Sequence, residues 1–146
     1  MSELSELQAM ALAAAGNAYA PYSRFHVGAA LRLADGSVET GANVENASYG
    51  MTLCAETVAL AKLANQGRLG EVREVAVLGG FIVDGALALN ETPVRPCGRC
   101  RQMLNEAAQL GGHDIMVHSI GAQGVESKPL SVLLPDAFGP ADLGLA

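Results

Sequence analysis

The placement of three cysteines most constrains how this chain of 146 residues can fold. Cys54 precedes a run with helical apolar spacing, and Cys97 and Cys100 open a second such run as a Cys-x-x-Cys. A Cys-x-x-Cys brings two sulfur atoms within reach of one metal ion, and a thiol from another helix start adds a third ligand. The fold must therefore bring together the N-termini of two helices that are far apart in the sequence.

A site with three protein ligands predicts catalytic rather than structural zinc, because one tetrahedral position stays open. Glu56 lies two residues after Cys54, so its carboxylate can reach water at that position without binding the metal. Two helix N-termini aimed at the ion would offset the charge of three thiolates and lower the pKa values of the thiols. The odd number of cysteines argues against a disulfide framework.

Other interpretations of the cysteines stay open on spacing alone. A Cys-x-x-Cys can be a thioredoxin-like redox pair, but that motif normally follows the first strand of a βαβ unit, and Cys54 would be unexplained. Cys54 alone can be a buried apolar residue, and the zinc can be structural although no fourth ligand is evident. The three histidines, His26, His113 and His118, lie on strand-like segments without ligand spacing, and we expect structural roles for them.

Hydrophobic periodicity predicts strands that alternate with helices, and this order favours a helix–sheet–helix sandwich in a single domain, residues 1–146. Asp35-Gly36 and Asp84-Gly85 are typical of hairpin turns. Thr52 is the expected N-cap of the second helix. Helices are predicted over residues 2–19, 52–66 and 97–111 with a short turn after 131, and strands over 26–33, 37–44, 73–80 and 113–120.

The charge of the chain limits its partners. The formal net charge is −6, which disfavours the basic surface that a polynucleotide needs, so a nucleic-acid-like ligand should be small. No apolar run approaches the roughly 20 residues of a spanning helix. The apolar stretch 10–20 follows Glu3 and Glu6 without a basic residue, unlike a signal peptide. We therefore expect an amphipathic helix, no membrane partner and a cytoplasmic protein.

Four separated blocks carry a family resemblance. "CAE" at 54–56 and "PCGRCRQ" at 96–102 resemble the zinc-dependent nucleoside deaminases, specifically the small homotetrameric cytidine deaminases. "PYSRFHVGAAL", "TGANVENASYG" and "LLPDAFGP" are similar to further blocks of that family, in the same order. The resemblance covers most of the chain. It implies an α/β/α sandwich with a mixed, roughly five-stranded sheet, assembled as a homotetramer.

The resemblance also implies a reaction and a set of residue roles. The reaction is the hydrolytic deamination of cytidine or deoxycytidine to uridine or deoxyuridine and ammonia, in pyrimidine salvage. The implied roles are zinc ligands (Cys54, Cys97, Cys100), proton shuttle (Glu56), ribose contacts (Asn43, Glu45), packing on the pyrimidine (Phe25), a backbone contact to the base edge (Ala55) and insertion into a neighbouring subunit's site (Phe138).

Three departures from the family's pattern bear on these roles. Thr57 stands where the family often has an arginine, or another long polar residue, that hydrogen-bonds the thiolates. Either another group compensates their charge, with Arg99 the nearest candidate in sequence, or the zinc stays more electron-rich and its bound water less acidic. The connection to the second thiol cluster is longer, and we expect its extra residues 81–89 to border the site entrance or a subunit interface. His26 replaces a proline that often follows the base-packing phenylalanine.

Competing functions remain at this point. The same chemistry can serve another aminated nucleoside, such as a modified cytidine or a blasticidin-like antibiotic. A polynucleotide editor is disfavoured by the acidic charge. A non-catalytic protein with structural zinc is disfavoured by Glu56 beside an open coordination position.

Overall fold

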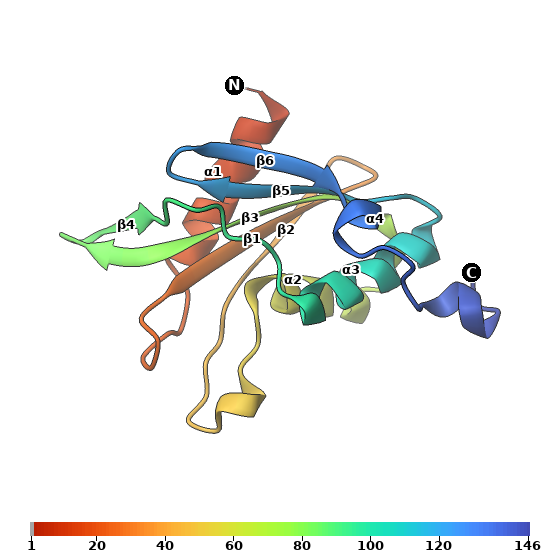
Figure 1. Cartoon of the computed structure of the whole chain (residues 1–146), viewed down its shortest axis with the longest axis horizontal. Helices are drawn as coiled ribbons and strands as arrows, with labels where there is room; N and C mark the ends of the chain where they lie inside the picture. The colour runs from red at the N-terminus through yellow and green to blue at the C-terminus, as the bar shows by residue number, and fades with distance from the viewer. Residues whose placement is uncertain (1) are drawn as a thin grey trace.

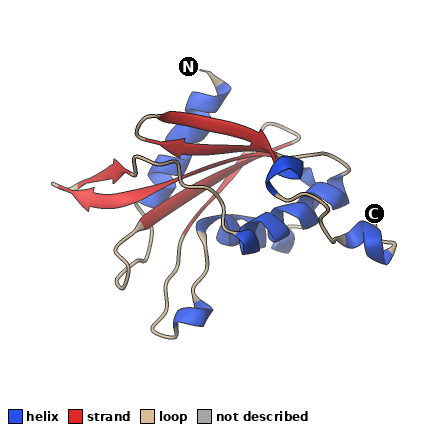
Figure 2. Ribbon diagram, in the orientation of Figure 1, coloured by secondary structure: helices blue, strands red, loops and turns tan. Residues whose placement is uncertain are grey.

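A computed structural model describes residues 2–146 and has a mixed six-stranded sheet with helices on both faces (Figures 1 and 2). The strand order is β2-β1-β3-β5-β6, and β4 pairs only with the far end of β3. The strands are β1 (His26–Leu33), β2 (Val38–Ala42), β3 (Val72–Val83), β4 (Ala86–Leu89), β5 (Met116–Gly121) and β6 (Gly124–Pro129). The helices are α1 (Glu3–Ala15), α2 (Ala55–Asn65), α3 (Gly98–Gly111) and α4 (Leu130–Leu133).

Strand alternation divides the core between the two faces of the sheet. Val75 and Val117 pack with α2 and α3, whereas Ala76, Leu78 and Ile120 pack with α1. Figure 1 shows α1 on one side of the sheet and α2 and α3 on the other. The predicted α/β/α sandwich is therefore confirmed, with six strands instead of about five.

The pairing of the strands explains why the sheet is mixed. β1–β2, β1–β3, β3–β4 and β5–β6 are antiparallel, and β3–β5 is parallel. The parallel pair is joined through α3, which crosses over one face. Both predicted hairpins form, and the turn at Asp84 and Gly85 has φ angles of 51° and 81°, as a two-residue primed turn requires.

Three sequence predictions are corrected by the structure. The first helix ends at Ala15 instead of near residue 19, because Tyr19 leaves the helix and pairs with Val44. The second helix has Cys54, not Thr52, as its N-cap. The hydroxyl of Thr52 instead accepts a hydrogen bond from the backbone of Asn46. Strand β6 was not predicted.

Close backbone packing fixes where α2 lies on the sheet. A Cβ atom on Gly41 of β2 would lie 2.4 Å from the carbonyl oxygen of Ala55 and 2.6 Å from the nitrogen of Ala59. The first turn of α2 therefore rests directly on β2.

The end of α3 is confirmed at Gly112, which has φ 68° and caps the helix in the left-handed conformation. No helix within residues 2–146 is long and apolar enough to cross a membrane.

Candidate metal centre and adjoining cavity

The three thiols meet at the N-termini of two helices, as predicted. Cys54 is the N-cap of α2, Cys97 is the N-cap of α3, and Cys100 lies in the first turn of α3. Their sulfur atoms all lie within 4.8 Å of one another, and those of Cys54 and Cys97 are 3.8 Å apart. Tetrahedral zinc with Zn–S bonds of ~2.3 Å needs sulfurs ~3.8 Å apart. The donor set therefore fits a zinc ion with three protein ligands.

The helix-start position explains why neither N-cap cysteine behaves as an ordinary cap. No side-chain capping hydrogen bond is made by Cys54 or Cys97, so both sulfur atoms are available to a metal. A hydrogen bond from the Cys100 thiol lowers the pKa of Cys54 to about 6, with smaller contributions from Cys97 and Arg99. The same contact and burial raise the pKa of Cys100.

Thr57 contacts one of the three sulfurs, although it lacks the charge of the arginine that the family resemblance implies at its position. It lies in the first turn of α2, is 8% exposed, and its Oγ1 is 3.4 Å from the sulfur of Cys100. A metal-bound thiolate can only accept, so the hydroxyl would donate to it. Arg99 makes no hydrogen bond to a sulfur within the described residues and points its guanidinium at the carbonyl of Thr52, 3.5 Å away. Its charge still lowers the pKa of Cys54.

Glu56 is a buried carboxyl beside the thiols. It is 3% exposed and lies in the first turn of α2, two residues after the N-cap Cys54. Burial, with a smaller contribution from the charge of Cys54, raises the pKa of Glu56 to about 7, while hydrogen bonds from its own backbone N–H and from the Cys100 side chain oppose the shift. Among the described residues, only the three cysteines form a potential metal-ligand cluster. The carboxyl is therefore placed to exchange protons near neutral pH without being a ligand.

A cavity of about 330 Å³ opens above these groups. Its walls come from the segment entering β1, the loop after β2, the start of α2 and the loop before α3. The lining residues are Ser23, Phe25, Val27, Asn43, Glu45, Thr52, Leu53, Cys54, Ala55, Glu56, Val94, Arg95 and Cys97.

Asn43 is buried and held by the backbone of the β1 segment. Its Oδ1 accepts from the N–H of Val27 at 2.9 Å, and its Nδ2 donates to the carbonyl of Phe25 at 2.9 Å. Each half of the amide keeps one further donor or acceptor position. The residue is thus oriented by the fold and can still bind a hydroxyl.

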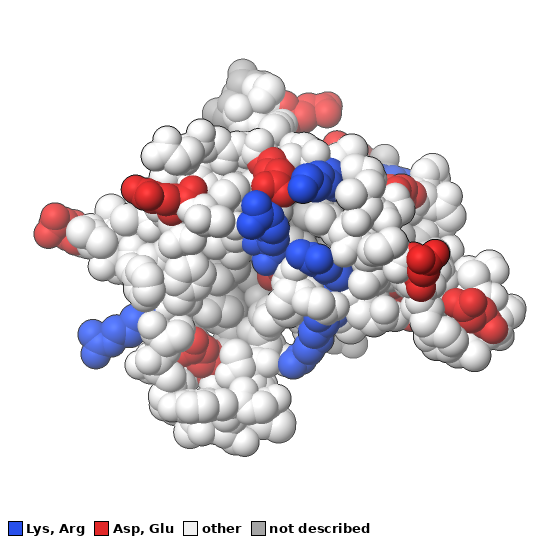
Figure 3. Space-filling view, viewed as in Figure 1, with Lys and Arg blue, Asp and Glu red and all other residues white. Residues whose placement is uncertain are grey.

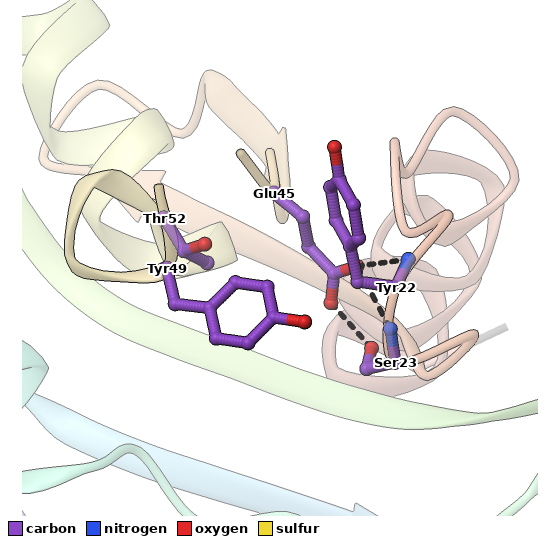
Figure 4. Close-up of a pocket in the computed structure, with 5 residues that line it drawn as sticks. All are labelled: Tyr22, Ser23, Glu45, Tyr49 and Thr52. Carbon is purple, nitrogen blue, oxygen red and sulfur yellow. Dashed lines mark hydrogen bonds between the residues drawn. The ribbon is translucent and has the colours of Figure 1, made fainter. Parts of the chain in front are cut away.

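Glu45 joins the cavity to a second pocket of about 260 Å³ (Figure 4). One carboxylate oxygen accepts from the backbone N–H groups of Tyr22 and Ser23, at 3.0 Å each, and the other accepts from the hydroxyl of Ser23. The hydrogen bond from the Ser23 hydroxyl is the main reason that the pKa of Glu45 is lowered. Tyr49 and Thr52 complete this pocket, and the Tyr22 and Tyr49 rings meet edge-on at 5.7 Å.

Most of the predicted site residues come together around the cavity. Cys100 lies buried behind it, and Phe138 lies elsewhere, 62% exposed, with its carbonyl accepting from Gln102 and Asn105. The seven that line the cavity are Phe25, Asn43, Glu45, Cys54, Ala55, Glu56 and Cys97.

The cavity also contains residues that were not predicted, chiefly Val27, Val94 and Arg95. Arg95 directly precedes the Pro-Cys pair, and this position was the available signal. Its guanidinium pairs with Glu126 through bonds of 2.7 and 3.2 Å, so β6 helps to hold this wall. No residue of 81–89 lines the cavity.

A helix-covered mixed sheet with three thiols and a buried carboxyl at two helix starts defines an α/β protein with a catalytic type of zinc site. The family described as "Cytidine and deoxycytidylate deaminase zinc-binding region" matches residues 1–111. A cytidine deaminase of Halalkalibacterium halodurans is 45% identical over 134 residues, which cover 91% of this chain and 92% of that protein. A cytidine deaminase of Mycobacterium tuberculosis is 44% identical over 137 residues, covering 94% and 90%.

The solved structures agree with the sequence comparison. The crystal structure of cytidine deaminase from Burkholderia pseudomallei superimposes with a TM-score of 0.78 at 42% identity, covering 94% of this chain and all (100%) of that one. The chain therefore belongs to the cytidine and deoxycytidylate deaminase family.

Proposed function

We propose that this protein hydrolyses cytidine and deoxycytidine to uridine and deoxyuridine, with release of ammonia. Cys54, Cys97 and Cys100 would hold zinc, and Glu56 would transfer protons. The proposal is supported by membership of the deaminase family and by the position of a buried carboxyl beside three convergent thiols. That juxtaposition, at the floor of a cavity large enough for a small ligand, is the observation that carries the proposal.

Zinc held by the three thiolates would act as a Lewis acid and lower the pKa of a water molecule toward neutral. Glu56 takes the proton from the attacking water and delivers it to N3 of the pyrimidine, which makes C4 more electrophilic. After the water oxygen has bonded to C4, Glu56 takes the remaining proton of that oxygen and delivers it to the amino group. The C4–N bond then breaks, the C4 carbonyl forms and ammonia leaves. A carboxyl with a pKa of about 7 suits both directions of transfer, because its two protonation states are similarly populated at neutral pH.

The remaining wall residues would hold the nucleoside. Phe25 packs on the pyrimidine ring, and the backbone of Ala55 contacts the edge of the base. Asn43 and Glu45 bind ribose hydroxyls through the donor and acceptor positions that their own protein contacts leave free. Ser23 and Tyr22 fix the direction of the Glu45 carboxylate, so the loop before β1 sets the position of the ribose.

Replacing Glu56 by Gln tests the assignment. The amide cannot shuttle a proton, so ammonia release should fall about 10²- to 10⁴-fold while zinc content, measured by elemental analysis, stays the same. Glu6→Gln changes an exposed carboxyl on α1, on the other face of the sheet, and serves as the control. Near-normal deamination by the Glu56→Gln protein would show that this carboxyl is not the proton carrier.

A larger aminated nucleoside is the second candidate, because the 260 Å³ pocket between Tyr22 and Tyr49 adjoins the main cavity through Ser23, Glu45 and Thr52. Ultraviolet absorbance with cytidine, deoxycytidine, deoxycytidine monophosphate, substituted cytidines and blasticidin S distinguishes the two. Faster turnover of a bulkier member than of cytidine would favour the second candidate.

Charge and ligand number argue against the other functions. On the face in Figure 3, Lys and Arg side chains form a short column near the middle, with acidic side chains beside and around it. This pattern lacks the continuous basic track of a polynucleotide editor. A structural zinc site would use four protein ligands, and only three cluster within residues 2–146.

We also propose that residues 1–146 form one catalytic domain that acts in the cytoplasm, in pyrimidine salvage, as a homotetramer with shared sites. Support for shared sites comes from Phe138, an exposed ring that contributes nothing to the cavity of its own chain. Support for a reducing compartment comes from the three cysteines, none of which forms a disulfide. A monomer by light scattering would remove the shared role of Phe138.

A further inference from the structure

The β3–β4 hairpin contacts one residue of the cavity wall, Phe25, through the side chain of Phe81. Strand alternation puts Val75 of β3 on the face covered by α2 and α3, and Gly79 and Phe81 follow on that same face. Their neighbour Ile82 is paired with Leu87, which packs toward the α1 face. Phe81 therefore lies on the side of the sheet that carries the cavity, although it does not line the cavity itself.

The end of β3 leaves space for the ring of Phe25, and we call this space the seat of Phe25. Gly79 lies under its ring, and a Cβ atom there would be 2.8 Å from Cε2 of Phe25 and 3.1 Å from Cγ2 of Val27. The absence of a side chain at Gly79 thus lets the Phe25 ring lie close to the strand. Val27 and Phe25 both line the cavity, so this seat is part of the cavity wall.

The ring of Phe81 packs against the ring of Phe25 at one side of this seat. Its ring meets the ring of Phe25 edge-on, with centroids 5.2 Å apart and an interplanar angle of 79°. This is a favoured geometry for an aromatic pair. Phe81 is 51% exposed, so it is not a residue of the main core, and the contact with Phe25 accounts for its orientation.

Strand pairing and core contacts fix the position of the hairpin that carries Phe81. A Cβ atom on Gly80 would lie 1.9 Å from the carbonyl oxygen of Ala88, so the two strands pack closely at the base of the hairpin. Phe81 is paired with Ala88 in the register. On the other face, Leu87 and Leu89 pack against the α1 side of the core. The position of the Phe81 ring is thus set by the sheet and by α1.

We propose that Phe81 is a positioning residue of the site, which holds the Phe25 ring against the pyrimidine from outside the cavity. The proposal rests on the proposed function, in which Phe25 packs on the base. Without the Phe81 ring, Phe25 gains freedom to tilt toward the hairpin, and the base loses part of its packing surface. The loss affects the bound substrate and the transition state alike, because Phe25 would pack on the face of the pyrimidine ring in both states.

Phe81→Ala is the direct test. It should raise KM for cytidine about twofold to tenfold, the range expected for an aromatic pair, with little change in kcat or zinc content. Phe81→Tyr keeps the ring, and its hydroxyl can point to solvent, so it should restore the normal KM. Ile82→Ala is the matched control, since Ile82 is 47% exposed in the same hairpin but belongs to the opposite face.

A readout that does not depend on activity comes from fluorine NMR. The chain has three phenylalanines, so fluorophenylalanine labelling gives three signals in the wild type and two in the Phe81→Ala protein. The Phe25 signal should shift in the Phe81→Ala protein and stay in place in the Ile82→Ala protein. An unshifted Phe25 signal, or a shift without a rise in KM, would overturn the proposal.

Two further outcomes are separated by the same experiment. A wild type that deaminates none of the panel of nucleosides contradicts the proposed function, whereas the fluorine signals still decide whether Phe81 positions Phe25. Sedimentation velocity at the assay concentration measures the oligomeric state of each protein. If the raised KM of the Phe81→Ala protein returned to normal at higher protein concentration, Phe81 would act through assembly and the proposal would be wrong.

Discussion

At the residue scale, Thr57 gives one buried hydroxyl to a site that holds three thiolates. Its Oγ1 lies 3.4 Å from the sulfur of Cys100. Hydrogen bonds to charged groups contribute more than neutral ones, roughly 1.5–3 kcal/mol, and outer contacts of this kind tune metal affinity. Arg99 adds a more distant positive charge on the Cys54 side. Thr57 and Arg99 thus each offset part of the negative charge of the cysteine sulfurs, for which the family resemblance implies a single arginine at position 57.

Thr57→Val should weaken zinc binding about tenfold, because the isosteric side chain leaves the thiolate without its donor. Thr57→Ser keeps the hydroxyl and should bind zinc nearly as well as the wild type. Competition with a chromophoric chelator measures both affinities without any assay of turnover. Equal affinities for the Val and Ser proteins would mean that the hydroxyl does not stabilise the bound metal.

Ser23 should control the protonation of Glu45. The fold lowers the pKa of this carboxyl below its usual 4.5, chiefly through the Ser23 hydroxyl, so it stabilises the folded state above pH 4.5. That contribution is lost as pH falls through the lowered pKa. Ser23→Ala should therefore raise the pKa of Glu45 toward 4.5 and move acid unfolding to higher pH.

Carboxyl carbon NMR measures the Glu45 titration directly. Ser37→Ala is the matched control, since its hydroxyl makes the same kind of contact with Asp35 and lowers that pKa instead. A Glu45 titration that is the same in the Ser23→Ala protein and in the wild type would show that the two backbone N–H groups alone hold the carboxylate.

At the element scale, the seat of α2 on β2 places the first thiol. A Cβ atom on Gly41 would meet backbone atoms of Ala55 and Ala59, which cannot move without the helix. Gly41→Ala should therefore cost about 1–3 kcal/mol in the free energy of unfolding and weaken zinc binding, because Cys54 adjoins the displaced turn.

Urea unfolding and chelator competition measure these two effects. Gly50→Ala is the control, since a Cβ atom there has no neighbour within 4 Å and should change neither value. Normal zinc affinity in a destabilised Gly41→Ala protein would mean that α2 shifts as a whole without moving its thiol.

Elements with their own patterning were predictable from the sequence, and elements that depend on their neighbours were not. Apolar periodicity located α1, α2 and α3, and Asp-Gly pairs located two hairpins. Strand β6 has mostly exposed residues and no alternation, so its pairing with β5 is what makes it a strand. The N-cap of α2 was misplaced by two residues because Thr52 is a better cap by propensity, whereas Cys54 occupies the position in the fold.

The same distinction holds for the site. The thiols and Glu56 could be predicted because their spacing carries the chemistry, and the family resemblance supplied Phe25, Asn43 and Glu45. Arg95 was missed, because what holds it at the cavity wall is Glu126, a partner distant in sequence. Phe81 falls within residues 81–89, which were expected at the site entrance or an interface, but its contact with Phe25 could not be predicted because the two rings are far apart in the sequence.

At the scale of the whole molecule, the proposed sharing of sites can be tested by mixing two defective variants. Phe138 does not line the cavity of its own chain, so each site would take this ring from a neighbour. Glu56→Gln subunits lack the proton carrier but keep Phe138, and Phe138→Ala subunits have the reverse defect. In a mixed assembly, some sites combine an intact Glu56 with a neighbour's intact Phe138.

Mixing the Glu56→Gln and Phe138→Ala proteins under conditions of subunit exchange should therefore give more activity than the sum of the separate proteins. The gain should rise to a maximum near equal amounts, because mixed contacts are then most frequent. The control mixes the Phe138→Ala protein with the Glu6→Gln protein, whose changed residue is exposed on α1. Activity in this mixture should only add up, so a gain there would point to nonspecific stabilisation on mixing. Activity that only adds up in the Glu56→Gln mixture, despite subunit exchange seen by mass spectrometry, would mean that each chain completes its own site.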